Sequence, residues 1–126
     1  MSVSTVANYP VVIIKMGSAS ERDMQRTFKQ VTQLTVGRGF VIYDCTDFHP
    51  NERQLARWIQ VQAMGLRGSL SDGTTYTFLV GANDAVADSV ERLEQETYGE
   101  VTVGLYDHMH EAVRHAEEGA RIFSAW

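Results

Sequence analysis

The chain has 126 residues, of which 44% are hydrophobic, and only two prolines, which predicts one compact domain spanning residues 1–126 with a core of its own. Sixteen acidic against eleven basic residues give a net charge of -5, which disfavours nucleic acid and anionic membrane surfaces as partners. One cysteine cannot form an internal disulfide, and the sequence shows neither a signal-peptide pattern nor a membrane-spanning apolar run, so we expect a cytoplasmic protein.

The N-terminal part predicts two strands and a helix. Residues 3–6 have weak strand character and could pair antiparallel with a strong apolar strand at residues 11–14. Ser18 and Glu21 have the spacing of a capping box, which predicts that a helix begins there and ends before Gly37 and Gly39. Its buried stripe should consist of Met24, Phe28, Val31 and either Leu34 or Thr35.

Residues 40–43, with the sequence FVIY, predict a central strand that is buried on both faces. Glycines precede this run, and polar residues follow it. Pro50 suits the first turn of a second helix, which should extend to about residue 66. The apolar stripe expected for this helix is Leu55, Trp58, Ile59, Ala63 and Leu66.

The C-terminal part repeats the alternation of strand and helix. Residues 76–80 predict a strand, and Asn83 or Asp84 can cap a helix that ends at Gly99. That helix should bury Val86, Val90, Leu93 and Thr97 and expose an acidic face to solvent. Residues 101–106 predict the last strand, followed by a helix that is capped by Asp107 and buries Met109, Ala112, Val113 and Ala116.

Four strand–helix units predict an α/β fold with a mixed, mostly parallel sheet of four to five strands, covered by helices on both faces. The loops that leave the carboxyl ends of parallel strands meet at one edge, where ligands usually bind. The candidate binding edge comprises Asp44, Thr46, Asp47, His49, Asn51, Asn83, Asp107 and His108. Helix capping is a sufficient role for Ser18, Asn83 and Asp107, and Cys45 is expected to be a buried core residue.

The polar residues of this edge do not form a recognisable catalytic or cofactor signature. Carboxylates and imidazoles at Asp47, His49, Asp107, His108 and His110 could ligate a divalent metal. However, His108 and His110 should point in different directions on a helix, so we expect no metal site. The segment after the strand at residues 11–14 lacks the glycine pattern and the lysine of a phosphate-binding loop. Without a set of acid, base and nucleophile, we expect no enzyme and no cofactor.

Residues 11–118 resemble the SpoIIAA-like or STAS (sulphate transporter and anti-sigma factor antagonist) group, in particular its small stand-alone bacterial proteins of unassigned role. The matching segments are residues 11–16 with the helix that follows, FVIYDCTDF, TYTFLVG and VGLYDHMHEAVRHAEE. The resemblance implies a mixed sheet with an antiparallel first strand. In the anti-sigma antagonists, a phosphorylatable Ser or Thr, a small residue and Gly open the helix after the central strand. Here FHPNER at residues 48–53 has no hydroxyl group and no glycine, although Thr46 lies upstream.

We therefore expect a non-catalytic regulatory or binding module whose edge from Asp47 to Asn51 engages a protein partner or a small ligand. One alternative is a small enzyme that uses His49 or His108 with Asp47. Another is a carrier of apolar ligands, because the SpoIIAA-like fold resembles the Sec14 type.

The C-terminal tail is apolar. Phe123 and Trp126 are three residues apart and, on a continued helix, would share a face with Ala116 and Ala120. This face could form a homodimer interface, which we expect, or fold back on the chain's own sheet.

Overall fold

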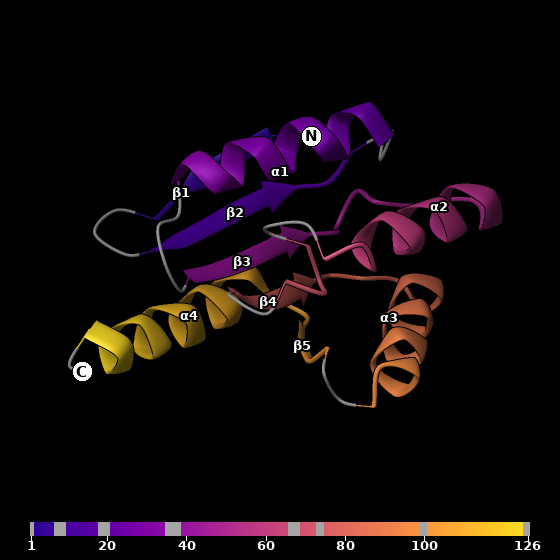
Figure 1. The fold of residues 1–126 in the computed structure, drawn as a ribbon. Coiled ribbons are helices and arrows are strands. Elements are labelled where there is room, and N and C mark those ends of the chain that lie inside the picture. The colour runs from indigo at the N-terminus through magenta and orange to yellow at the C-terminus, as the bar shows by residue number, and fades with distance from the viewer. Residues whose placement is uncertain are drawn as a thin grey trace.

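A computed structural model of the chain describes residues 2–6, 10–17, 21–34, 39–65, 69–72, 75–98 and 101–124. In this part of the chain, strands and helices alternate after an initial pair of strands (Figure 1). The elements are β1 (Ser2–Thr5), β2 (Val11–Lys15), α1 (Glu21–Leu34), β3 (Gly39–Asp44), α2 (Glu52–Gln62), β4 (Thr75–Val80), α3 (Asp84–Glu96), β5 (Val103–Tyr106) and α4 (Met109–Ser124).

The five strands form one sheet in the order β1-β2-β3-β4-β5. β1 pairs antiparallel with β2, and Val3 lies opposite Ile14. The other pairs are parallel, and Val41 of β3 lies between Val12 of β2 and Thr77 of β4. The predicted fold class, a mixed and mostly parallel sheet with helices, is therefore confirmed, as is the antiparallel first strand.

The helices divide three to one between the faces of the sheet. Each parallel crossover moves the chain one strand further in the same direction across the sheet. Because such connections are right-handed, α1, α2 and α3 all lie on one face. α4 lies on the opposite face (Figure 1). The larger core lies under the three helices and includes Met24, Phe28, Val41, Tyr43, Trp58, Leu79, Val86, Val90 and Leu93. The smaller core joins Val11, Phe40, Ile42 and Val80 to Ala112, Ala116 and Ala120 of α4.

β3 is the central strand, as the sequence predicts. Val41, Ile42 and Tyr43 are all 0% exposed. Because successive side chains of a strand point to opposite faces, Val41 and Tyr43 belong to the larger core, and Phe40 and Ile42 belong to the smaller one. Both faces of β3 thus depend on the helices that cover them.

α4 lies close to the sheet because it presents small residues to it. Besides its three buried alanines it has Gly119, where an added Cβ would lie 2.5 Å from Cζ of Phe40. The Phe40 ring itself stacks on Tyr76 at 5.3 Å and packs against Phe78 at 5.9 Å between ring centroids. A row of aromatic rings therefore fills the space beneath one small-residue helix.

The boundaries of α2 and of the helix after it differ from prediction. α2 ends at Gln62 rather than near residue 66, and Ala63 is exposed. The side chain of Gln62 turns inward and accepts a hydrogen bond from the Leu70 amide at 2.8 Å, so the chain folds back at this point. After α3, Tyr98 has φ of 53° and adopts the left-handed conformation that often ends a helix. The sequence predicts this conformation at Gly99, which lies outside the described residues.

The last strand and the last helix also begin later than predicted. β5 begins at Val103 rather than at residue 101, and α4 begins at Met109. The His108 carbonyl accepts hydrogen bonds from the amides of Glu111 and Ala112, so His108, and not Asp107, occupies the cap position. Pro50 likewise precedes the cap residue of α2 instead of lying in its first turn.

Several predictions fall on parts of the chain that the structure does not describe. They include the capping box at Ser18 and the side chains of Val31, Leu34, Phe123 and Trp126. Within the described ranges, no helix combines the length and the apolar character needed to cross a membrane.

Candidate functional site

The segment after β3 makes a tight turn that its own side chains hold. The Oδ1 atom of Asp44 accepts hydrogen bonds from the Thr46 amide at 3.1 Å and from the Thr46 hydroxyl at 2.7 Å. The Cys45 amide donates to the Val80 carbonyl of β4 at 2.8 Å. Asp44 is half-buried, whereas Thr46 and Asp47 are exposed. The turn therefore fixes the direction in which the chain leaves the sheet.

The loop after β4 lies against this turn. Gly81 has φ of 67°, a left-handed conformation that glycine adopts readily, and its amide donates to the Tyr106 carbonyl at 2.9 Å. A Cβ at Gly81 would lie 3.0 Å from the Thr46 hydroxyl oxygen. The ends of three neighbouring strands therefore meet here, which is the convergence that the predicted parallel sheet requires.

Phe48 anchors the segment in the core. Its side chain is 2% exposed and packs against Trp58 of α2, with 5.4 Å between ring centroids. Its neighbours Asp47 and His49 are both exposed. Sequence reasoning predicted that Trp58 is buried but did not identify Phe48 as its partner. The available signal was an aromatic residue alone between polar neighbours, directly before a helix.

The two asparagines of the candidate edge have structural roles. Asn51 and Gln54 form a reciprocal capping box at the start of α2, with hydrogen bonds of 2.9 Å and 3.0 Å. The Asn83 side chain accepts from the Val86 amide at 2.9 Å and caps α3, as predicted. Because these side-chain oxygens already bind helix amides, neither asparagine is well placed to ligate a small molecule.

The histidines near α4 lie closer together than the sequence suggests. The rings of His108 and His110 are stacked, with 5.5 Å between centroids and 15° between planes. The expectation that they point apart is wrong, because His108 precedes α4 and does not follow helical geometry. Among the described residues, no three or more His, Cys, Asp or Glu side chains are grouped so that they could hold a metal ion.

Asp47, His49, Asp107 and His108 remain separate from one another. All four side chains are exposed, and no hydrogen bond or ion pair joins any two of them in the described part of the structure. The structure thus brings Thr46 to Asp44 and Gly81, and His108 to His110, but it does not assemble the predicted edge into one constellation.

Cys45 is a buried core residue, as expected. Its side chain is 0% exposed, and burial, with a smaller contribution from the Asp44 carboxylate, raises the pKa of the thiol to about 12. At neutral pH the thiol is therefore protonated and unreactive. Burial also raises the pKa of Tyr43 beside it.

Another ionisable pair lies on the α4 side of the sheet. The Tyr106 hydroxyl oxygen lies 2.8 Å from Nδ1 of His115, and the two rings meet edge to face. Burial, and to a lesser degree the charge of Glu111, raises the pKa of Tyr106. This contact fastens α4 to β5.

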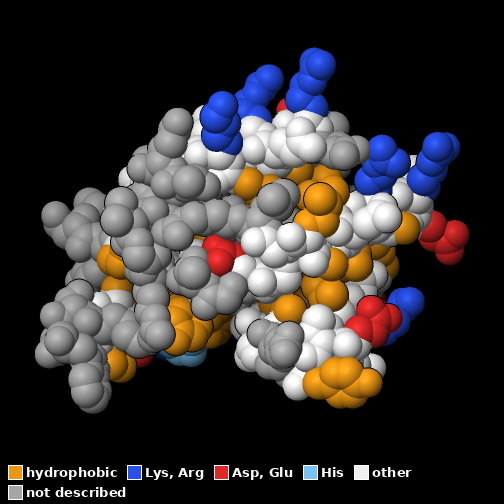
Figure 2. Space-filling model, in the orientation of Figure 1, with side chains coloured by type: hydrophobic (Ala, Val, Ile, Leu, Met, Phe, Trp, Pro, Cys, Tyr) orange, Lys and Arg blue, Asp and Glu red, His pale blue; other side chains and the backbone are white. Residues whose placement is uncertain are grey.

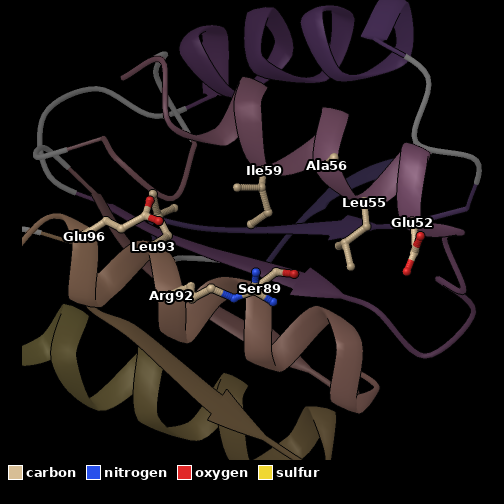
Figure 3. A pocket seen from close by; sticks show the side chains of 8 residues that line it. All are labelled: Glu52, Leu55, Ala56, Ile59, Ser89, Arg92, Leu93 and Glu96. Carbon is tan, nitrogen blue, oxygen red and sulfur yellow. The ribbon is translucent and has the colours of Figure 1, made fainter.

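Sequence reasoning missed a groove of about 310 Å³ between α2 and α3 (Figure 3). It is lined by Glu52, Leu55, Ala56, Ile59, Ser89, Arg92, Leu93 and Glu96. Leu55, Ile59 and Leu93 were predicted to belong to the core, but Leu55 and Ile59 are only half-buried. The partial exposure of two apolar residues depends on how far α2 and α3 lie apart, which the sequence pattern does not reveal.

Comparison with known protein families, with curated proteins and with solved structures found no match for this chain.

Proposed function

We propose that this protein is a non-catalytic regulatory module that binds a protein partner through the recognition loop, which we define as residues 46–51. The observation that supports this proposal is an exposed polar loop on a rigid base. Thr46, Asp47, His49 and Asn51 are exposed, while Phe48 between them is buried against Trp58. A loop held in one conformation loses little entropy when it binds, so it favours recognition of a protein surface.

The contacts of the candidate edge support binding rather than catalysis. Asp47 and His49 flank the inward-pointing Phe48, and neither is bonded to a second polar side chain in the described residues that could orient it as an acid or a base. Asn51 and Asn83 are engaged as helix caps. An enzyme using His49 or His108 with Asp47 is thus the weaker hypothesis.

The packing of the interior also bears on the carrier hypothesis. Trp58, Tyr43 and Phe48 are among the largest fully buried side chains, and they fill the space between the sheet and α2. An apolar ligand there would have to displace them. We therefore favour a module that uses its surface.

We also propose membership of the SpoIIAA-like or STAS group of bacterial proteins, with a cytoplasmic location. Support comes from the antiparallel β1 and from the strand–helix alternation of a small mixed sheet. The recognition loop ends in Asn51 as the cap of α2, at a place where the anti-sigma antagonists have a phosphorylatable residue. This difference supports the proposal that the chain is a member of the group that is not regulated by phosphorylation at this position.

The structure bears on the homodimer hypothesis through α4. Ala116 and Ala120, which should share a helix face with Phe123, are buried against the chain's own sheet. That contact favours a tail that folds back on the sheet over a tail that forms a homodimer.

The proposal can be tested by photo-crosslinking in the cells that produce the protein. A photo-reactive amino acid at position 49 should crosslink to one protein, and Asp47→Arg should abolish that product. The matched control carries the same amino acid at position 25, an exposed glutamine of α1 on another part of the surface. Identical products from both positions, or a product that Asp47→Arg leaves unchanged, would contradict the proposal.

A further inference from the structure

We propose that the free edge of β5 binds an extended, basic segment of a protein partner, which adds a further strand to the sheet. The surface concerned is the outer edge of residues 103–106, and it does not include the recognition loop. The inference therefore does not depend on the function proposed for that loop.

The hydrogen bonds of β5 show which of its backbone groups face the edge. The Tyr106 carbonyl accepts a hydrogen bond from the Gly81 amide at 2.9 Å, so the backbone groups of Tyr106 face β4. Because these groups alternate in direction along a strand, the amides and carbonyls of Val103 and Leu105 face away from β4. In the part of the chain that the structure describes, β5 is the last strand on this side of the sheet (Figure 1). An extended segment can therefore pair with the amide and the carbonyl of both residues.

β5 is held in place on the α4 face of the sheet. The rings of Phe78 and Tyr106 meet edge to face, with 5.2 Å between centroids. They lie over Gly104, where an added Cβ would be 2.8 Å from Cδ1 of Phe78. The Tyr106 hydroxyl in turn contacts His115 of α4. A strand fixed in this way loses little entropy when another strand pairs with it, which favours binding.

The side chains of β5 suit an added strand. Leu105 lies opposite Leu79 of the larger core, yet its side chain is 52% exposed. An apolar side chain of the added strand would pack beside Leu105 and remove that surface from water. β5, with the sequence VGLY, has no charge or proline that would oppose pairing, whereas the other edge strand, β1, has the mostly polar sequence SVST. The edge of β5 is therefore the more favourable of the two.

Carboxylates flank this edge on both faces of the sheet. α3 carries five carboxylates and one guanidinium, that of Arg92, which lines the groove toward α2. By helical geometry, Glu91 and Glu94 lie on the side of α3 away from α2, which is the side toward the edge of β5. On the other face, burial and the charge of Glu111 raise the pKa of Tyr106, so this carboxylate also lies close to β5.

The basic side chains of the described residues lie mainly elsewhere. Figure 2 shows Lys and Arg side chains gathered over α1 and α2. These residues are Arg22, Arg26, Lys29, Arg53 and Arg57. Arg114 and Arg121 of α4 lie on the side of that helix opposite its buried alanines, away from the sheet. Lysines or arginines that flank the added strand would therefore meet carboxylates, which selects a basic segment.

The test uses a fluorescent peptide of about eight residues, with alternating valine and threonine in the centre and lysines at both ends. Its control is the same peptide with every central amide N-methylated, which keeps the charge and the side chains but removes the donors for strand pairing. Fluorescence anisotropy should show that the unmethylated peptide binds at least about tenfold more tightly than this control. It should also bind at least about tenfold more tightly than a peptide with glutamates in place of the lysines.

Amide hydrogen exchange measured by NMR locates the contact. In the free protein the Leu105 amide should exchange quickly, whereas the Tyr106 amide, which faces β4, should be protected. Saturation with the unmethylated peptide should slow exchange of the Leu105 amide at least about tenfold, because that amide becomes a donor to the added strand.

Matched proline variants place the site on β5. Leu105→Pro removes an amide that β4 does not use, and proline is accepted at such edge positions, so peptide binding should fall at least about tenfold in a folded protein. Thr5→Pro makes the same change at the edge of β1, because the Val6 amide binds the Val11 carbonyl and the Thr5 amide therefore faces away from β2. It should leave peptide binding unchanged. Circular dichroism checks that both variants fold.

Four results would each overturn the proposal: equal binding of the methylated or the glutamate peptide, no binding at millimolar peptide, unchanged exchange of the Leu105 amide, or unchanged binding to folded Leu105→Pro. If Leu105→Pro does not fold, exchange of the Leu105 amide in the unchanged protein decides. Self-association of the chain that Leu105→Pro abolishes would assign the edge to a second copy instead.

Discussion

Gly119→Ala should destabilise the protein, although the same change stabilises most helices. In an exposed helix interior, alanine is favoured over glycine by about 1 kcal/mol. In α4, however, the new Cβ would lie 2.5 Å from Cζ and 3.0 Å from Cε1 of Phe40. Carbon atoms in contact normally lie about 3.5–4.0 Å apart, so either the ring or the helix must move by about 1 Å.

Neither movement is easy in this structure. The Phe40 ring is held by Tyr76 and Phe78, and α4 cannot rise without separating Ala116 and Ala120 from the sheet. Overpacking of a filled core costs about 1–3 kcal/mol, and this contact belongs at the upper end of that range. After the helix preference is subtracted, we expect a loss of about 1–2 kcal/mol in the free energy of unfolding.

Urea unfolding followed by tryptophan fluorescence measures this loss. Glu118→Ala, at an exposed position of the same helix, is the matched control and should change stability by less than about 0.5 kcal/mol. In a Phe40→Leu background the clash is removed, so Gly119→Ala should become neutral or stabilising. A stabilising effect of Gly119→Ala in the otherwise unchanged protein would refute the packing of α4 described here.

Four further predictions follow from the fold. Ile42→Ala should cost about 2–5 kcal/mol of unfolding free energy, and an unchanged urea midpoint would remove β3 from the centre of the core. Asn51→Ala and Asn83→Ala should each cost about 1 kcal/mol as lost helix caps, measured in the same way, and no loss would show that these side chains do not cap. Above pH 9 the thiol of Cys45 ionises in the unfolded chain, whereas in the folded chain it stays protonated up to about pH 12. The free energy of unfolding should therefore fall by up to about 1.4 kcal/mol per pH unit in this range, and less steeply in Cys45→Ala. An equal slope in both proteins would contradict this explanation. Light scattering should show that the full chain is a monomer, and circular dichroism should show that a chain ending at Gly119 is unfolded. If the full chain is instead a dimer, and the chain ending at Gly119 is a folded monomer, the tail belongs to an interface.

The sequence predicts most of the fold because its signals are local. Four apolar runs alternate with amphipathic helices, and the FVIY run is apolar throughout, as a strand buried on both faces must be. The cap at Asn83 is also local, because the acceptor and the amide it binds are three residues apart.

The errors arise where tertiary contacts decide the structure. α2 stops at Gln62 because that side chain binds the Leu70 amide eight residues later, which no helix periodicity encodes. His108 and His110 stack because α4 starts one residue after His108. The α2–α3 groove depends on the distance between two helices, and it therefore has no sequence signature.

Native mass spectrometry of the protein purified from the cells that produce it tests the central claim most directly. Binding through the recognition loop predicts a complex of this chain with a second polypeptide, and Asp47→Arg should release that polypeptide without changing the fold. A chain that instead retains a metal ion or a lipid, with no bound polypeptide, would contradict a protein-binding module and support the enzyme or the carrier hypothesis.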